Sequence, residues 1–335
     1  METVDATKNV GDPSWRTIIS KYNFPDLRKS IWQLIDSVGP LLVIWLLMYF
    51  SIDISYWITL ALAIPAAGFM VRIFIIFHDC GHKSFFKKPV WNEWIGFFTG
   101  LLTFTAYHSW HRSHNKHHAT VGNLDKRGIG DVLTMTVEEY KAAKWYKRTF
   151  YRIYRNPAVM FLIAPPLIFI VQNRIFTRNL QSREKWNIVW TNIAIIILFG
   201  GVGLLIGFKT LILIQLPVYY FAAIWGVWLF YVQHQYNGVH WYRDKVWDYE
   251  TVALNGSSFY KLPRLLQWFS GHIGFHHVHH LSARIPNYKL EKCHNENALF
   301  RKIEPITLAQ SFKSLRLRLW DEKSNRLVSF TEARN

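Results

Sequence analysis

Histidines are the residues of this sequence that are best placed to do chemistry. The chain has 15 of them in 335 residues, and most fall in clusters with helical spacing. The segment HDCGH carries two at positions i and i+4, and both HRSHNKHH and HHVHH contain the pattern H-x-x-H-H. Offsets of three and four place side chains on one helix face, so each cluster can direct its imidazoles to a common point. The clustered residues are His78 and His82, then His114, His117 and His118, then His276, His279 and His280.

Imidazole is a common ligand of iron, copper, zinc and nickel, so the clusters predict a transition-metal site. His234, just beyond an apolar segment, adds a ninth nitrogen. Nine nitrogens are too many for one octahedral ion and suit two ions. Carboxylate-bridged di-iron bundles need paired Glu-x-x-His motifs, whereas this chain has one such tetrad, from Glu291 to His294. We therefore predict a two-metal centre held by histidines.

The composition indicates how these clusters are positioned. Hydrophobic residues make up 50% of the chain and charged residues 18%, below the roughly 25% charged residues of ordinary soluble domains. Long apolar runs predict four membrane-spanning helices in two tight hairpins, at 31–50 with 56–77 and at 186–206 with 211–231. The segment 94–107 is too short to cross, and 157–171 has two prolines and basic flanks, so we expect it to dip in or lie flat.

Basic residues predict the orientation of the spans. Lys21, Arg28 and Lys29 precede the first span, whereas the SIDIS turn after it has no basic residue. The positive-inside rule therefore places the amino terminus in the cytoplasm, and with four spans all the histidine clusters lie on that face.

We expect a single all-α membrane domain over residues 1–335, in which two transmembrane hairpins and interfacial helices carry a cytoplasmic cap with the histidine-rich di-metal site. Its parts are a cytoplasmic N-terminal segment 1–30, hairpin 31–77, a cytoplasmic and interfacial segment 78–185 with the first two clusters, hairpin 186–231, and a cytoplasmic segment 232–335 with the third cluster.

The motifs resemble those of a known family. HDCGHKSFF, HNKHHATVGNLDKRG and GFHHVHHLSARIPNYKL are similar to the three histidine boxes of membrane fatty acid desaturases, and most similar to bacterial acyl-lipid (phospholipid) delta-5 desaturases. The resemblance runs from the first hairpin to RLWDEKSNRLVSF. It implies a non-haem di-iron centre that uses O₂ to introduce a cis double bond into saturated acyl chains of membrane lipids.

The same resemblance implies which residues hold the metals. The family's ligands carry over by position to the eight box histidines, and His234 matches an extra ligand that follows the last span in stearoyl desaturases. An asparagine that holds a metal through water in that family is Phe230 here, and Asn237 or His240 could replace it.

Ligating imidazoles generally need hydrogen-bond partners, so polar residues near the boxes are candidates for that role. For each of them a capping, surface or packing role is the open alternative. The candidates are Asp79, His111, Asp125, Asp131, His272 and His277, while His108, His240 and His294 are expected to be structural.

The net charge of +17 bears on the partners. The basic residues are spread over loops without a nucleic-acid-binding module, so nucleic acid is not an expected partner. They suit anionic lipid and an acidic protein. Desaturation needs two electrons, and the chain has no haem-binding HPGG, flavin or iron–sulfur motif. We therefore expect an external ferredoxin or flavodoxin as electron donor. The apolar spans and the resemblance to bacterial desaturases predict a location in the bacterial cytoplasmic membrane.

Two alternatives to desaturation stay open at this point. Hydroxylation of the acyl chain uses the same kind of site. A metal transporter or a di-haem electron carrier is more remote, because transporters place ionisable groups near mid-span, whereas these histidines lie at span ends. The double-bond position, the headgroup and the oligomeric state do not follow from the sequence.

Overall fold

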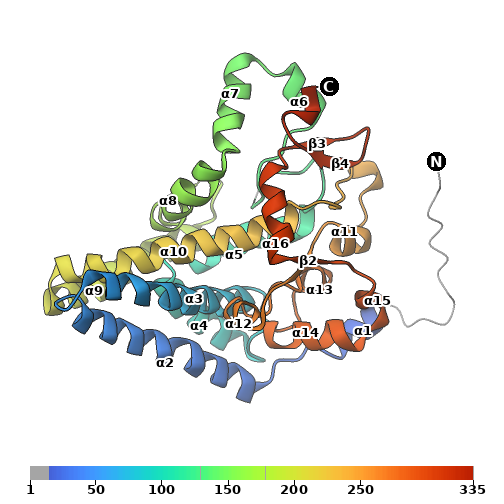
Figure 1. Ribbon diagram of the computed structural model, residues 1–335. Helices are drawn as coiled ribbons and strands as arrows, with labels where there is room; N and C mark the ends of the chain where they lie inside the picture. The colour runs from blue at the N-terminus through green and yellow to red at the C-terminus, as the bar shows by residue number, and fades with distance from the viewer. Residues whose placement is uncertain (1–14, 129, 178, 335) are drawn as a thin grey trace.

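The computed structural model describes residues 15–128, 130–177 and 179–334, so residues 1–14 of the expected N-terminal segment lie outside the described part. The described chain is mainly helical (Figure 1), and four of its helices are long and apolar enough to cross a membrane. They are α2 (Leu27–Ser51), α3 (Tyr56–Gly81), α9 (Ser182–Ile206) and α10 (Phe208–His234). They pair as two hairpins, which confirms the predicted fold class.

The outer faces of these helices are apolar and exposed. Leu42 and Val43 on α2 are 54% and 58% exposed, and Ile196 and Ile197 on α9 are 71% and 69% exposed. Contact of such a surface with water costs roughly 25 cal/mol per Å², whereas lipid chains cover it without that cost. The protein is therefore an integral membrane protein.

Local sequence explains where the spans begin and end. Asp26 caps α2 by accepting hydrogen bonds from the backbone N–H groups of Arg28 and Lys29. The second hairpin turns at Gly207, whose φ of +86° favours glycine. The turn is shorter than the expected GFKT segment because α10 already starts at Phe208. At its other end α10 extends to His234, which ends the helix instead of following it.

The two short apolar segments are not continuous spanning helices. Helix α4 (Pro89–Leu102) has 14 residues, about 21 Å at 1.5 Å per residue, less than the ~30 Å hydrocarbon core. The other segment forms a π-helical turn (Val159–Ile163) and α8 (Ala164–Ile170). Pro165 and Pro166 have no N–H to donate, which interrupts regular helix there. With α7 (Trp145–Tyr154) this segment forms a pair bent by 57°, a broken span or a re-entrant loop.

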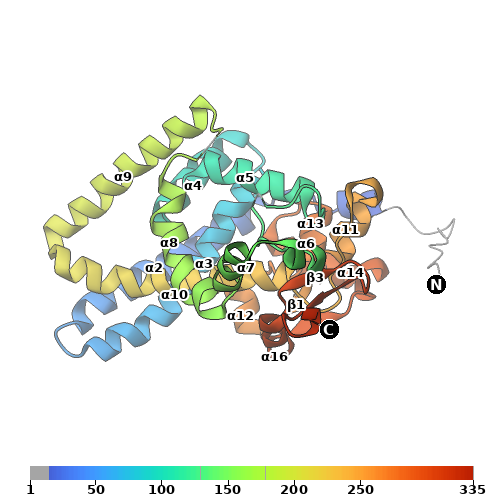
Figure 2. The same cartoon turned by 90° about the horizontal axis from the view of Figure 1, so that it is seen from above.

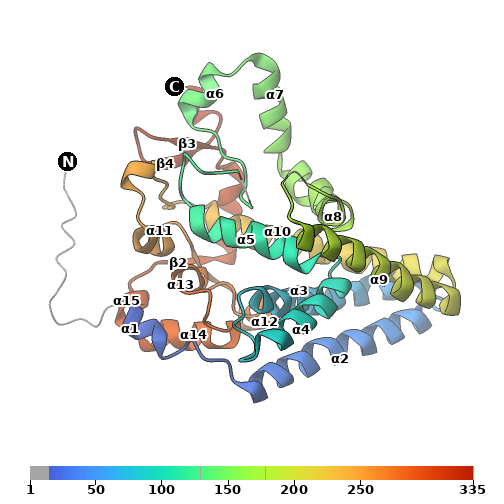
Figure 3. The same cartoon turned by 180° about the vertical axis from the view of Figure 1, so that it is seen from behind.

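Short elements form a cap on one end of the spans. Figure 2 shows α10 running into this cap, and Figure 3 shows α5 between the hairpins on one side and α11 and α13 on the other. In the described residues β1 pairs in parallel with β2, and β3 pairs antiparallel with β4. The remaining elements are α1 (Trp15–Ser20), α5 (Tyr107–Thr120), α6 (Val137–Ala142), α11 (Tyr249–Asn255), β1 (Phe259–Lys261), α12 (Arg264–Phe269), α13 (His276–Leu281), α14 (Asn287–Glu296), α15 (Ala298–Arg301), β2 (Pro305–Thr307), α16 (Leu308–Ser311), β3 (Leu319–Asp321), β4 (Arg326–Val328) and 3₁₀ turns at Gln172–Arg174, Asp244–Val246, Phe312–Arg316 and Glu332–Arg334.

Arg72 ties the first hairpin to the cap. Its guanidinium lies 3.9 Å from the centre of the Trp268 ring, and Nη1 donates to the Trp268 carbonyl at 2.5 Å. Nη2 lies 3.4 Å from the Asp36 carboxylate on α2. The Arg72 side chain is buried and is held by these partners.

Candidate metal centre

All nine predicted histidines lie together where four helices meet. They come from the last turn of α3 and the residue after it, from α5, from the end of α10, and from α13. Two groups form, and within each the candidate ligand nitrogens all lie within 4.8 Å of one another. The first group is His78, His82, His114, His118 and His279, and the second is His117, His234, His276 and His280.

The H-x-x-H-H pattern explains why there are two groups. On α5, His114 and His118 are one turn apart and belong to the first group, while His117 belongs to the second. On α13 the assignment is reversed, because His276 and His280 belong to the second group and His279 to the first. Each of these helices therefore contributes to both groups and holds the two at a constant separation.

The hydrogen bonds of the second group test whether the site suits a metal. His117 Nδ1 pairs with the Asp131 carboxylate, and His234 Nδ1 lies 3.2 Å from the carbonyl oxygen of Gly256. A proton on Nδ1 satisfies both acceptors, and a neutral imidazole of this tautomer carries its lone pair on Nε2. Those two Nε2 atoms lie 3.1 Å apart. Two lone pairs at that distance repel each other, and a cation bound by both removes the conflict.

The first group shows the same need for a cation. Nε2 of His82 is buried without a hydrogen-bond partner among the described residues. His279 Nε2 lies 3.1 Å from His118 Nε2, with the His114 ring beside them. Unpaired buried nitrogens are costly, so both groups fit metal ions.

Five imidazoles of α5 and α13 are neutral because of their surroundings. Burial, and then repulsion from neighbouring imidazoles, lowers their pKa well below the ordinary value of 6.5. A neutral imidazole offers the lone pair that a metal binds. The residues concerned are His114, His118, His276, His279 and His280.

The sequence of this chain matches a known protein family. The family model for fatty acid desaturases matches residues 55–306, which contain all nine histidines. The chain belongs to the fatty acid desaturase family. The predicted recognition is thereby confirmed, and the protein is an enzyme, an oxidoreductase.

Individual desaturases resemble the chain to different degrees. A fatty acid desaturase of Bacillus subtilis is 46% identical over 312 residues, which cover 93% of this chain and 89% of the relative. An sn-1 oleoyl-lipid 12-desaturase of Synechocystis sp. is 29% identical over 268 residues, covering 77% and 71%. An sn-1 acyl-lipid omega-3 desaturase (ferredoxin) of Nostoc sp. is 26% identical over 278 residues, covering 80% and 74%.

Two aspartates of this desaturase contact histidines of the site. Asp79 Oδ1 lies 3.2 Å from His78 Nδ1, and Oδ2 accepts hydrogen bonds from the backbone and side-chain amides of Asn287 at 2.7 and 2.9 Å. Asp131 binds His117. Both carboxylates can orient an imidazole and increase its basicity, as is typical of metal-binding histidines.

The hydrogen bonds and ion pairs of the other candidate supporting residues are made with groups other than the nine histidines. Asp125 forms a surface ion pair with Arg243 at 2.6 Å. His272 Nδ1 lies 3.0 Å from Glu291, and His277 Nε2 lies 3.0 Å from His294 Nδ1. His111 Nε2 bonds the side chain of Asn115 at 2.8 Å, although its ring lies 6.4 Å from that of His82. The contacts of Asp125, His272 and His277 therefore match the surface or packing role that the sequence left open as the alternative.

Phe230 occupies the position where related stearoyl desaturases have an asparagine. Its ring centre lies 5.3 Å from that of His117 and 5.5 Å from that of His234. The suggested replacements, Asn237 and His240, are both exposed. Phe230 therefore places an apolar ring beside two imidazoles of the second group.

Sequence reasoning missed two contributors to the site. Trp110 stacks on His114 with 4.4 Å between ring centres and an interplanar angle of 19°. It lies one helical turn before that histidine, a spacing that could have identified it. The Gly256 carbonyl that binds His234 had no such signal, because a backbone acceptor 22 residues away depends on the path of the loop.

An apolar pocket adjoins the metal centre on the membrane side. It is lined by α3, α8 and α10, with Phe74 and Gly226 among its residues. Phe74 contacts Trp110 edge to face at 5.4 Å between ring centres, and Trp110 stacks on His114. The pocket and the first histidine group are thus connected through one tryptophan. Its lining residues are Met70, Val71, Phe74, Thr103, Phe169, Tyr219, Ala222, Ala223 and Gly226.

Proposed function

We propose that this protein is an O₂-dependent acyl-lipid desaturase that introduces a cis double bond at carbon five of saturated chains in membrane phospholipids. The observation that carries the proposal is the pair of histidine groups next to an apolar pocket between spanning helices. The relatives named acyl-lipid and oleoyl-lipid desaturases support the substrate class, and the resemblance to bacterial delta-5 desaturases supports the position.

In this proposal nine histidines hold two iron ions, five in the first group and four in the second. When bound, the iron supplies the oxidant needed to break two unactivated C–H bonds. Overall, a –CH₂–CH₂– unit, O₂, two electrons and two protons become –CH=CH– and two waters. Asp79 and Asp131 keep their imidazoles in the ligating tautomer, and Phe230 keeps the second group dry.

In this scheme the apolar pocket, which measures about 30 Å³ before the chain enters, marks the path of the acyl chain. Its residues offer carbon surface from three helices and few polar groups, so the chain is positioned by shape rather than by hydrogen bonds. The electrons come from an acidic carrier, a ferredoxin or a flavodoxin. The relative from Nostoc is named as ferredoxin-dependent. The site faces the cytoplasm of a bacterial cell, where such carriers are found.

The test is the fatty acid profile of a desaturase-free bacterial host that expresses the chain, by gas chromatography with localisation of the double bond. We expect a new monounsaturated chain with its double bond at carbon five. His279→Ala should abolish the product, while His240→Ala, which changes an exposed histidine outside both groups, should retain it.

Other outcomes reject defined parts of the proposal. A double bond elsewhere would reject only the position. A hydroxylated chain would identify the enzyme as a hydroxylase. Absence of any new lipid, despite membrane expression and a supplied electron carrier, would overturn the proposed activity.

A further inference from the structure

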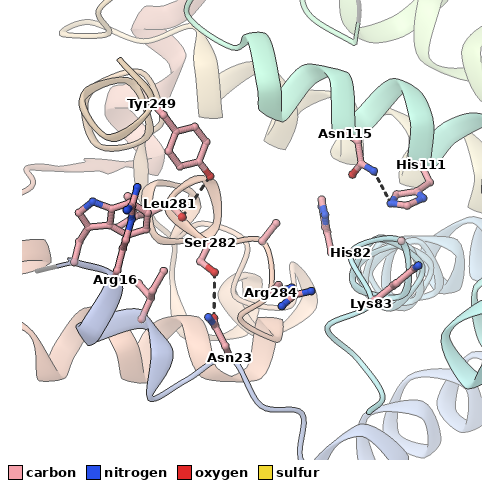
Figure 4. Close-up of a pocket in the computed structure, with 14 residues that line it drawn as sticks. Arg16, Asn23, His82, Lys83, His111, Asn115, Tyr249, Leu281, Ser282 and Arg284 are labelled. Atoms are coloured by element: carbon pink, nitrogen blue, oxygen red, sulfur yellow. Dashed lines mark hydrogen bonds between the residues drawn. The ribbon is translucent and has the colours of Figure 1, made fainter. Parts of the chain in front are cut away.

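A second, polar pocket opens against the first histidine group from the cap side (Figure 4). Its volume is about 670 Å³, and its wall includes His82. The lining comes from α1, from the turn after α3, from α5, from α11 and from the segment after α13. We call it the basic pocket, after Arg16, Lys83 and Arg284 in its lining.

The charge of this pocket has one sign. Arg16, Lys83 and Arg284 are exposed, and none of the 14 lining residues is acidic. Among the described residues no ion pair neutralises any of the three cations. His111 adds no positive charge at neutral pH, because burial lowers its pKa to about 4. The pocket therefore attracts anionic groups.

The basic and apolar pockets lie on opposite sides of the first histidine group. On α3, Phe74 of the apolar pocket precedes His78 by one turn, and His82 of the basic pocket follows it by one turn. The eight helical steps from Phe74 to His82, the residue that follows α3, span about 12 Å. His82 is a half-buried residue whose ring separates the basic pocket from the other four imidazoles of its group.

We propose that the basic pocket is the docking site for an acidic electron-transfer protein, with Lys83 and Arg284 contacting its carboxylates and His82 facing its redox centre. The proposal rests on the proposed function, which requires two electrons per double bond. The carrier is oxidised, the metals are reduced, and the two protons come from solvent. Substrate and electrons then reach the metals from opposite sides, so neither blocks the other.

The position of the pocket favours a protein over the headgroup of the substrate lipid. Two of its walls, α1 and α11, lie at the end of the molecule away from the α2–α3 and α9–α10 turns (Figure 1). A headgroup has to remain at the membrane surface next to its acyl chain, whereas a soluble carrier approaches the cap freely. The charge complementarity also matches an acidic carrier, because opposite potentials steer such encounters.

The experiment uses the full-length, iron-loaded enzyme in nanodiscs of saturated phospholipid, supplied with O₂. The probe is a plant-type [2Fe–2S] ferredoxin, kept reduced by NADPH and ferredoxin reductase. The test variant is Lys83→Gln with Arg284→Gln. The matched control is Lys313→Gln with Arg316→Gln, which removes two exposed charges from another cavity of the cap.

We expect the test variant to raise KM for ferredoxin roughly tenfold, with kcat nearly unchanged, and to flatten the dependence of KM on salt. The control should change KM less than about twofold. Single-turnover desaturation driven by dithionite should be equal in all three proteins, because this small reductant needs no docking surface.

Each other result has a defined meaning. If the control variant raises KM and the test variant does not, the docking proposal is wrong. If the test variant instead raises KM for lipid, or slows the dithionite-driven reaction, the basic pocket holds the headgroup and the proposal is also wrong. If the wild-type enzyme forms no unsaturated lipid with dithionite, the proposed desaturation activity is wrong, whatever the docking site.

Discussion

At the scale of single residues, the tautomer of each imidazole decides which nitrogen faces the metal. His117 is directed by the Asp131 carboxylate and His234 by the Gly256 carbonyl, both through Nδ1. The two acceptors are not equivalent, because the carboxylate is charged and buried while the carbonyl is neutral. A charged acceptor makes the imidazole more basic and so strengthens its bond to a metal.

We therefore expect Asp131→Asn to weaken metal binding by about 10- to 100-fold. The measurement is iron per protein, by plasma mass spectrometry, during titration with a chelator. Asp125→Asn is the matched control, since this aspartate lies in the same loop region but pairs with Arg243 at the surface. Equal iron loss in both variants would contradict the role of Asp131.

At the scale of helices, α3 and α10 each carry both ligands and pocket-lining residues. Gly226 on α10 lies eight residues, about 12 Å, before His234. A Cβ added at Gly226 meets nothing within 4 Å, so the pocket has open space at that point. If an acyl chain occupies the pocket, the distance from Gly226 to the histidines limits how many of its carbons fit between the metal centre and the end of the pocket.

Gly226→Leu should shorten the usable pocket. We expect at least about tenfold less product from the chains that the wild type prefers, with a shift towards shorter ones, since one methylene in an apolar pocket changes rates 10- to 200-fold. The readout is the chain-length profile of unsaturated lipid. Gly201→Leu on α9, also with open space around it, should leave the profile unchanged. Identical profiles for all three proteins would place the acyl chain elsewhere.

The loops between the spanning helices offer positions at which the orientation of the protein in the membrane can be tested. Cys80 and Cys293 are buried, so cysteines introduced at exposed positions can be labelled selectively. With an impermeant maleimide on intact protoplasts, we expect Asp53→Cys, in the α2–α3 turn, to react, and Lys87→Cys, after α3, to react only after lysis. The reverse pattern would place the metal centre outside the cell.

At the scale of the whole molecule, the metal centre joins segments that are far apart in the chain. Its histidines come from α5, α10, α13 and the end of α3, so the cap and both hairpins meet at the nine imidazoles. Without a cation the lone pairs of His117 and His234 face each other at 3.1 Å. Metal binding should thus stabilise the fold as a whole and not only the site.

Removal of the metal should lower the unfolding temperature of the enzyme in nanodiscs by roughly 5 °C or more. Reduction and chelation would strip the iron, and differential scanning calorimetry would record the transition before and after re-addition. His240→Ala should respond as the wild type does. An unchanged Tm in protein shown to be iron-free would mean that the fold does not depend on the metal.

Much of this protein follows from its sequence alone. Long apolar runs and the spacing of histidines are local properties of the sequence. The runs reflect the transfer of apolar side chains from water to lipid, and the spacing reflects the periodicity of the α-helix. Together they identified the four spanning helices and the nine histidines that the structure brings together. Proximity in the sequence was a poor guide for Asp125. This residue follows the second histidine box in the chain, but its carboxylate pairs with Arg243 at the surface.

The tertiary structure decided what depends on segments distant in the chain. The division of nine imidazoles into groups of five and four, the Gly256 carbonyl at His234, and the separation of a basic pocket from an apolar one all arise where α3, α5, α10 and the cap meet. No local pattern encodes them, because each is set by how packed helices and loops place side chains and backbone atoms from different elements of the chain.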